Sequence, residues 1–73
     1  MQTIKLREEF IRLGQALKAS GLCDTGSEAK IAVQSGQVKV NGETETRRGR
    51  KLTGSEVIEF EGQQVLIEGM HED

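Results

Sequence analysis

The sequence predicts an α+β fold in which two short helices pack on one side of a small, mostly antiparallel sheet. Three observations lead to this prediction. Apolar residues recur at helical spacing in the first third of the chain, a helix-capping pattern follows, and alternating apolar and polar residues flank turn dipeptides from residue 37 onward. We expect the 73 residues to form one domain, residues 1–73, that folds without a partner and is a monomer.

The first quarter of the chain predicts a strand followed by a helix. Residues 3–6 alternate apolar and polar side chains, as in a short edge strand that Lys5 protects from aggregation. From Phe10 onward apolar residues recur at helical spacing until Gly21, which ends the helix. The helix start stays open, because Phe10 and its successor also suit the end of the strand. Gly14 costs about 1 kcal/mol relative to alanine, so we expect the second helix or a ligand backbone to approach closely there.

A second helix is marked at both ends. The Thr25 side chain can accept a hydrogen bond from the Glu28 amide while the Glu28 side chain reaches back to the Thr25 amide, which is the capping-box pattern. Gly36 is expected to close the last turn with a positive φ, which a residue without a side chain adopts at no steric cost. Residues 22–24 link the two helices so tightly that the helices must cross at a marked angle.

A hairpin is predicted directly after this helix. Val38 and Val40 alternate with polar residues and therefore share one face of a strand. Asn41 and Gly42 form the dipeptide best suited to hold positive φ at both central positions of a tight turn. Residues 43–46 have only polar faces, so we expect an exposed strand or loop there.

Two further strands complete the predicted sheet. Residues 52–55 suit a turn, and residues 56–61 and 64–68 suit strands joined across Gly62 and Gln63. Alternation along these strands places four apolar side chains towards the core: Ile58, Phe60, Val65 and Ile67.

The residues needed for catalysis or metal binding are not grouped in this sequence. Cys23 has no second thiol or nearby histidine at ligand spacing, so we expect a small buried hydrophobe between the helices. His71 is expected to be a solvated tail residue, and no serine has a histidine to activate it. The glycines stand singly at turns instead of forming a phosphate-binding loop. The sequence therefore predicts no enzyme, no cofactor and no small-molecule substrate.

Charge is distributed unevenly along the chain. The net charge is −2, but residues 27–51 carry six basic and three acidic groups, whereas residues 52–73 carry six acidic groups and no basic one. Screening over about 8 to 10 Å allows one face to remain positive despite the negative total. Since no apolar run can span a bilayer and the N-terminus lacks the apolar core of a secretion signal, we expect a cytoplasmic protein without membrane contact.

A basic loop, residues 47–51, offers a hypothesis about function. Lys30 lies one turn into the second helix, whose first free amides, with the hydroxyls of Thr25 and Ser27, suit a phosphate oxygen. The arginines of the basic loop could close over the same groove, with guanidinium groups binding phosphate through paired hydrogen bonds. The composition supports equally well a solvated loop that offsets the acidic C-terminal block.

A family resemblance favours the binding hypothesis. Residues 13–18 resemble the first helix of the alpha-L RNA-binding motif, the domain type of ribosomal protein S-four, and residues 27–30 resemble its second helix. Residues 35–42 resemble its signature turn and residues 54–58 its late strand. The sequence Val-Asn-Gly followed by Arg-Arg-Gly-Arg-Lys-Leu is similar to stand-alone bacterial members that contain little besides this domain. The resemblance covers about residues 10–68 and leaves residues 69–73 as a tail.

The resemblance implies an RNA-binding role in translation or on the ribosome, with contacts along both helices and the following loop. Asp24 and Gly26 depart from members that place basic groups at the start of the second helix, which weakens that end of the surface. The only aromatic residues, Phe10 and Phe60, lie in apolar patterns, so base stacking is not expected. The implied partner is structured RNA, either ribosomal or transfer RNA. The implied RNA contacts are Lys18, Thr25, Ser27, Lys30, Lys39, Arg47, Arg48, Arg50 and Lys51.

Two alternatives stay open. The domain could be a protein-interaction adaptor that uses the exposed segment 43–46 or the acidic C-terminal block. A small enzyme is the second alternative, but no group of residues supports it. Binding that weakens steeply with salt would separate RNA binding from the adaptor role.

Overall fold

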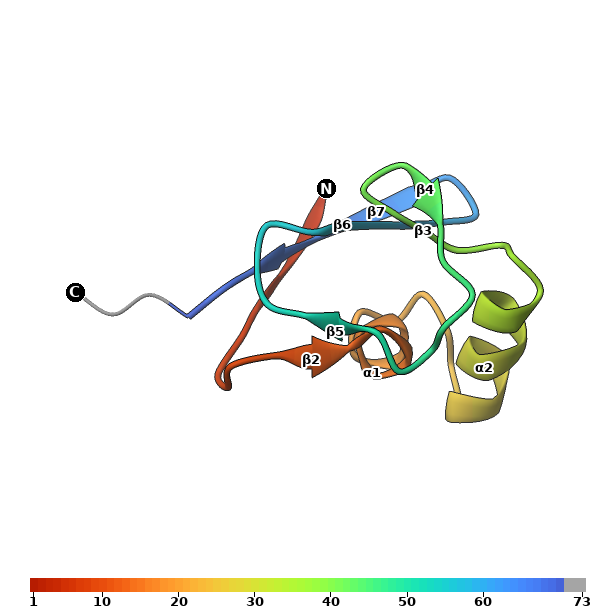
Figure 1. Ribbon diagram of the computed structural model, residues 1–73, viewed down its shortest axis with the longest axis horizontal. Coiled ribbons are helices and arrows are strands. Elements are labelled where there is room, and N and C mark those ends of the chain that lie inside the picture. Colours follow the sequence, from red (N-terminus) through yellow and green to blue (C-terminus); the bar gives the residue numbers. More distant parts are fainter. Residues whose placement is uncertain (71–73) are drawn as a thin grey trace.

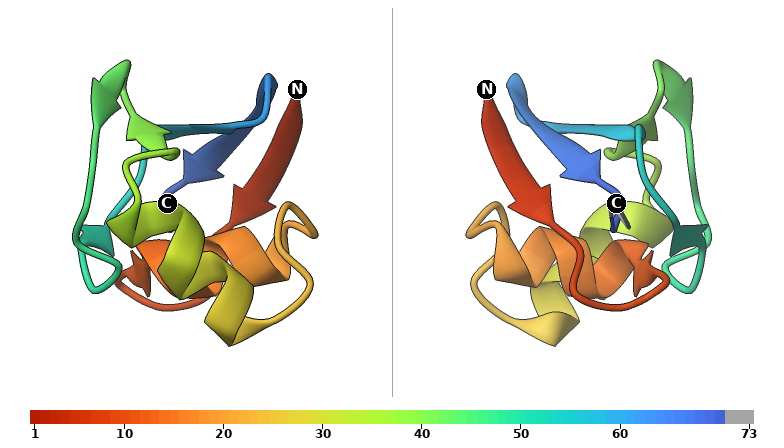
Figure 2. Two further views of the ribbon diagram at one scale, coloured as in Figure 1. Left: turned by 90° about the vertical axis from the view of Figure 1, so that its right-hand side faces the viewer. Right: turned by 90° about the vertical axis from the view of Figure 1, so that its left-hand side faces the viewer.

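A sheet layer and a helix layer make up the structure, a computed structural model that describes residues 1–70 (Figure 1). The five strands of the main sheet lie in the order β1-β7-β6-β3-β4. Their bounds are Gln2–Lys5 (β1), Gln63–Glu68 (β7), Val57–Phe60 (β6), Lys39–Val40 (β3) and Glu43–Thr44 (β4). The helices α1, Leu13–Ala19, and α2, Gly26–Gln34, lie together beneath one face of this sheet (Figure 2). This arrangement confirms the predicted α+β class.

The edge strand predicted near the N-terminus is present as β1. It pairs in parallel with β7, with Gln2 opposite Val65 and Ile4 opposite Ile67, whereas the other pairs of the main sheet are antiparallel. A parallel pair cannot be closed by a tight turn, so nearly the whole chain lies between these two strands.

The first helix begins later than its apolar pattern suggested. Helix α1 starts at Leu13, and the two preceding residues form β2, Ile11–Arg12, which pairs with β5, Lys51–Leu52, in a separate two-stranded ribbon. Phe10 therefore precedes a strand and is not part of the helix. The predicted end is confirmed, because Ser20 is the C-cap and Gly21 has φ of +80°.

The second helix has the predicted cap with one difference. Thr25 Oγ1 accepts from the Glu28 amide at 3.0 Å, as expected. The Glu28 carboxylate, however, accepts from the amide of Asp24 at 3.1 Å instead of the Thr25 amide. The side chain thus reaches one residue further than a capping box requires. Gly36 has φ of +80° beyond the helix, which confirms the predicted helix end.

Both predicted hairpins form, the second with a shifted turn. Asn41 and Gly42 have φ of +53° and +82°, as the first turn requires, and Asn41 Oδ1 also accepts from the Val57 amide at 2.9 Å. The second turn is Glu61-Gly62, with φ of +51° and +76°, and not Gly62-Gln63. Strand β7 therefore begins one residue earlier than predicted.

The core lies between the sheet and the helices. The four strand residues predicted to face inward are buried, as are Val38, Val40 and Cys23. Leu52, expected in a turn, is also fully buried because it belongs to β5. Glu45 is a second difference, since this residue of a segment expected to be exposed is only 7% exposed. His71 lies outside the described residues.

None of the helices described within residues 1–70 is long and apolar enough to cross a membrane.

Candidate functional site

The basic loop is bound along its backbone to the start of α1. The carbonyl oxygens of Arg48 and Arg50 accept from the amides of Gly14 and Leu13, both at 2.9 Å. Between them, the Gly49 carbonyl accepts from Arg12 Nη1 at 2.8 Å. The first amides of a helix have no partner within the helix, and here the basic loop supplies acceptors for two of them. The loop and the helix start therefore form one hydrogen-bonded unit.

Gly14 allows the loop to lie this close. A Cβ atom added at this position would lie 3.0 Å from Cγ of Arg48 and 3.6 Å from its carbonyl oxygen. The close approach predicted at Gly14 is present, but the neighbour is the basic loop and neither the second helix nor a ligand. The glycine lets the Arg48 side chain cross the surface of α1.

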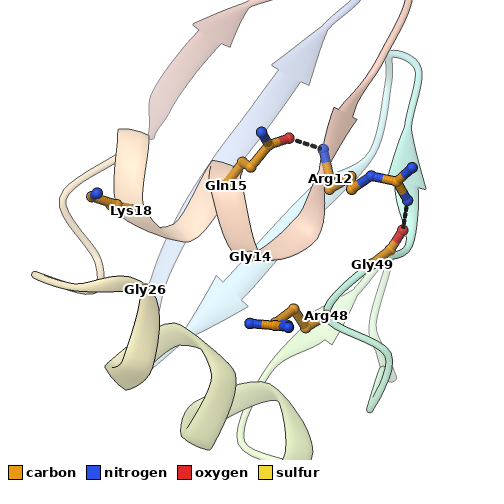
Figure 3. A pocket seen from close by; sticks show the side chains of 7 residues that line it. All are labelled: Arg12, Gly14, Gln15, Lys18, Gly26, Arg48 and Gly49. Carbon is orange, nitrogen blue, oxygen red and sulfur yellow. Dashed lines mark hydrogen bonds between the residues drawn. The ribbon is translucent and has the colours of Figure 1, made fainter.

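A basic cleft of about 340 Å³ lies where α1, the start of α2 and the basic loop meet (Figure 3). Figure 3 shows Arg48 extending beneath α1 towards α2, with Lys18 at the far end of α1. Three of its lining residues are basic and none is acidic. The residues that line the basic cleft are Arg12, Gly14, Gln15, Lys18, Gly26, Arg48 and Gly49.

The cations of the basic cleft differ in their partners. Arg12 is held by the Gly49 carbonyl, and its own amide donates to Gln15 Oε1 at 3.1 Å. Neither Lys18 nor Arg48 forms a side-chain hydrogen bond or an ion pair within residues 1–70. These two charges are thus available to an anion.

The start of α2 contributes backbone donors to the same place. The Glu28 amide is occupied by Thr25 Oγ1, whereas no hydrogen bond in the described part of the chain uses the amides of Gly26 and Ser27. A Cβ at Gly26 would meet no atom within 4 Å, so the space beside the first residue of this helix is open. The free amides and the helix dipole favour negative charge at this end of a nine-residue helix.

Glu45 binds two arginines of the basic loop, Arg47 and Arg50. Its carboxylate accepts from Arg47 Nε at 3.3 Å and Nη2 at 3.2 Å, and from Arg50 Nη1 at 3.2 Å. It also accepts from the amides of Thr46 and Arg47, at 3.0 and 3.2 Å. The hydrogen bonds from the Arg47 side chain are the main reason that the pKa of Glu45 is lowered to about 2, against the opposing effect of burial. Glu45 is therefore ionised at neutral pH.

The remaining residues predicted as RNA contacts do not line the basic cleft. Thr25 and Ser27 flank Gly26, with the Thr25 hydroxyl already used as the helix cap. Lys30 and Lys39 are exposed on α2 and β3 and do not line the basic cleft. Lys51 lies on β5 with its Nζ 4.7 Å from the centroid of the Phe10 ring. Of the nine residues predicted from sequence, the structure brings Lys18 and Arg48 together in the basic cleft.

Sequence reasoning missed Arg12 and Gln15, which also line the basic cleft. A signal for Arg12 was its position next to the helix start, where a long basic side chain can reach an approaching loop. A helical pattern that counts only apolar residues gives no such signal. No group of three or more histidine, cysteine or acidic residues suited to a metal ion occurs in residues 1–70.

Comparison with known proteins gives consistent results. The family model described as "S4 domain" matches residues 4–68. "Putative RNA-binding protein YbcJ" of Escherichia coli (strain K12) is 37% identical over 68 residues, covering 92% of this chain and 97% of the relative. "Probable ribosome maturation protein RlbA" of Bacillus subtilis (strain 168) is 42% identical over 59 residues, covering 81% and 83%.

A solved structure also matches. The solution structure of Escherichia coli YbcJ, described as revealing an ALFAL motif involved in RNA-binding, superposes with a TM-score of 0.73 at 36% identity. The match covers 94% of this chain and 89% of that one. The agreement therefore extends over nearly the whole chain.

Proposed function

This chain belongs to the S4-domain family of RNA-binding proteins, and on that premise we propose that it docks on folded RNA without catalysing a reaction, binding backbone phosphates in the basic cleft. One observation carries the proposal. Lys18 and Arg48 have no ion-pair partner within residues 1–70 and line the same cleft as Gly26, which begins a helix whose first amides have no partner either. Nucleic-acid phosphates commonly accept hydrogen bonds from charged side chains and from the amides at helix N-termini.

Each group has a separate role in this proposal. Arg48 offers a planar guanidinium that can bind two phosphate oxygens, and Lys18 offers a point charge at the other side. The amides of Gly26 and Ser27 donate to a phosphate oxygen between them. Seven predicted residues would make flanking contacts as the RNA backbone leaves the basic cleft: Thr25, Ser27, Lys30, Lys39, Arg47, Arg50 and Lys51.

The aromatic residues support recognition by backbone and shape. Phe60 is 4% exposed and belongs to the core, so it cannot stack on a base. The Phe10 ring has Lys51 Nζ at 4.7 Å and the guanidinium carbon of Arg12 at 5.5 Å from its centroid. Sequence-specific binding of single strands usually depends on exposed aromatic faces. A folded RNA whose phosphates match the basic cleft suits this surface better.

We propose ribosomal RNA as the first target to test, with transfer RNA second. The Bacillus subtilis relative is named as a probable ribosome maturation protein, which favours ribosomal RNA for a chain of similar extent. The adaptor alternative has less support, because the exposed strand β4 offers only two residues, Glu43 and Thr44, for pairing with a peptide.

The test compares charge removal inside and outside the basic cleft. Lys18→Ala combined with Arg48→Ala should weaken binding to purified ribosomal RNA, refolded with Mg²⁺, by at least about tenfold, which corresponds to about 1.4 kcal/mol. The slope of log affinity against log salt should become shallower by about 2, since two phosphate contacts are lost.

The matched control is Lys5→Ala combined with Arg7→Ala, which removes the same charge from exposed residues that do not line the basic cleft. We expect this control to retain most of the affinity in filter-binding titrations. Equal losses in both double variants, or no loss in the Lys18 and Arg48 variant, would reject the basic cleft as the RNA site.

A further inference from the structure

We propose that Glu45 is a positioning residue whose buried carboxylate fixes the shape of the basic loop, so that an acidic side chain increases the affinity of the protein for RNA. This inference rests on the proposed function and adds a residue that belongs to neither the basic loop nor the basic cleft. Negative charges near an RNA site ordinarily oppose binding. An acidic residue that increases RNA affinity is therefore unexpected, and replacing Glu45 tests this inference.

The first step of the argument is the number of donors that converge on this carboxylate. Glu45 is 7% exposed and accepts five hydrogen bonds, two from backbone amides and three from guanidinium nitrogens. Its own amide donates to the Val38 carbonyl at 3.0 Å, which anchors the residue next to the main sheet. A buried carboxylate with this many partners is held in one position.

The second step is the place of those partners in the basic loop. Arg47 and Arg50 are the first and last residues of a turn, in which the Arg50 amide donates to the Arg47 carbonyl at 3.2 Å. Both of their side chains bind Oε1 of Glu45, at 3.2 Å each. In the middle of the turn, the Arg48 carbonyl accepts from the Gly14 amide of α1 and the Gly49 carbonyl accepts from the Arg12 side chain of β2. Glu45 thus fixes the ends of the turn, while Arg12 and Gly14 fix its middle.

The third step concerns Arg48, whose side chain points into the basic cleft (Figure 3). The turn fixes where this side chain starts and Gly14 leaves room for its path, while the side chain has no hydrogen-bond or ion-pair partner of its own within residues 1–70. A turn held at both ends presents Arg48 to RNA with little further loss of conformational entropy on binding. Without Glu45, two like charges at Arg47 and Arg50 would face each other and open the turn.

Arg47 also has capacity left for RNA. Its side chain is 77% exposed, while that of Arg50 is 33% exposed and that of Glu45 10%. A guanidinium has five N–H donors, and Arg47 uses only part of them on Glu45. The ion pair therefore orients Arg47 without removing it from the surface.

The experiment uses Glu45→Gln in the full chain, with Glu43→Gln as the matched control, and measures binding to ribosomal RNA refolded with Mg²⁺. Both variants lose one negative charge, but Glu43 is exposed and makes no hydrogen bond with the basic loop. We expect Glu43→Gln to bind as tightly as the wild type or a few-fold more tightly, and Glu45→Gln to bind about three- to tenfold more weakly. Backbone order parameters should fall at residues 47–50 only in Glu45→Gln. Tighter or unchanged binding of a folded Glu45→Gln would overturn the inference.

If Glu45→Gln does not fold, Glu45→Asp takes its place. Aspartate keeps the charge but is one methylene shorter, so long-range electrostatics predicts unchanged affinity, whereas a positioning role predicts a loss of at least about threefold. Unchanged affinity would overturn the inference. The Lys18 and Arg48 double variant, measured in parallel, separates this outcome from a failure of the proposed function, because it tests the basic cleft without altering Glu45.

Discussion

Among single residues, Gly14 affects the proposed site most directly, because its missing side chain leaves room for Arg48. Gly14→Ala should strengthen α1 by up to about 1 kcal/mol through helix propensity. The new Cβ would meet Arg48 Cγ at 3.0 Å, so the exposed Arg48 side chain must move. We expect the free energy of unfolding to change by less than about 1 kcal/mol, while RNA affinity falls by about three- to tenfold.

Urea unfolding and RNA titration of Gly14→Ala measure these two quantities separately. A large loss of stability would show that the loop backbone, and not the side chain, limits the space at this position. Unchanged affinity would show that RNA binding does not depend on where Arg48 lies.

Glu45 leads to a prediction about acid stability. Its pKa is lowered from the ordinary value of 4.5 to about 2, chiefly by hydrogen bonds from Arg47. The unfolded chain therefore binds more protons between these pH values, so the contribution of Glu45 to stability is complete above about pH 4.5 and is lost as the pH falls towards 2. Glu45→Gln removes this dependence, and the stability difference between wild type and variant should shrink from pH 6 to pH 3. If urea unfolding gave the same stability difference between wild type and variant at pH 6 and pH 3, this prediction would be wrong.

The burial of Glu45 is a feature that could not be predicted from the sequence. Residues 43–46 are entirely polar, so no periodicity marks one of them as buried. The two arginines that neutralise Glu45 were visible two and five positions later, but a solvated loop has the same composition. The carboxylate is buried only in the folded chain, where Arg47 and Arg50 both turn back to it and its amide binds Val38.

At the scale of elements, the turn after β5 packs against the end of β7. A Cβ at Gly54 would lie 2.8 Å from Cα of Gly69, and Gly54 has φ of +140°. Gly62 has φ of +76°, and a Cβ added there would meet no atom within 4 Å, so this position provides a control with backbone strain alone.

We expect Gly62→Ala to cost about 1 to 2 kcal/mol of unfolding free energy, as an alanine in the left-handed region does. Gly54→Ala should cost at least about 2 kcal/mol more, because backbone atoms must also move. Thermal and urea unfolding of the two variants test this difference. Equal losses of unfolding free energy would show that the backbone around Gly69 moves with little cost.

The elements with local signals were predicted well. The cap at Thr25, the turn at Asn41 and the inward face of the last two strands each depend on residues close in sequence, and the structure confirms them. The ribbon of β2 and β5 was missed because two-residue strands have no period to detect. For the same reason the sequence left open whether Phe10 begins the helix or ends a strand.

At the scale of the whole molecule, the basic cleft is a local positive region, with three basic lining residues and no acidic one. Glu59 and Glu68 lie on β6 and β7 of the main sheet and do not line the basic cleft, so the acidic strands are separate from it. The net charge of −2 is therefore a poor guide to what an approaching polyanion meets.

This separation predicts that RNA binding weakens with salt despite the negative total. With four phosphate contacts, the slope of log affinity against log salt should be about −3, which is a loss of about 60-fold between 50 and 200 mM salt. Titrations across this range measure it. A slope near zero would mean that neither the basic cleft nor its flanking cations bind phosphate.

Sequence reasoning could not supply the pairing of β1 with β7 at this scale. Alternation marked both segments as strands, but it contains no information about which distant strand lies next to which, or in what direction. The residues of the basic cleft could not be grouped from sequence for the same reason. The cleft combines α1, the start of α2 and the basic loop, which come from separate regions of the chain.

The parallel pairing has a consequence for biosynthesis. Strand β1 has its main-sheet neighbour in β7, the last strand described, so its amides stay unpaired while the intervening chain is translated. At about 5 to 20 residues per second, that delay is roughly 3 to 12 seconds. During translation β1 is an open strand, and Lys5 at its end carries a charge that discourages premature association with other nascent chains.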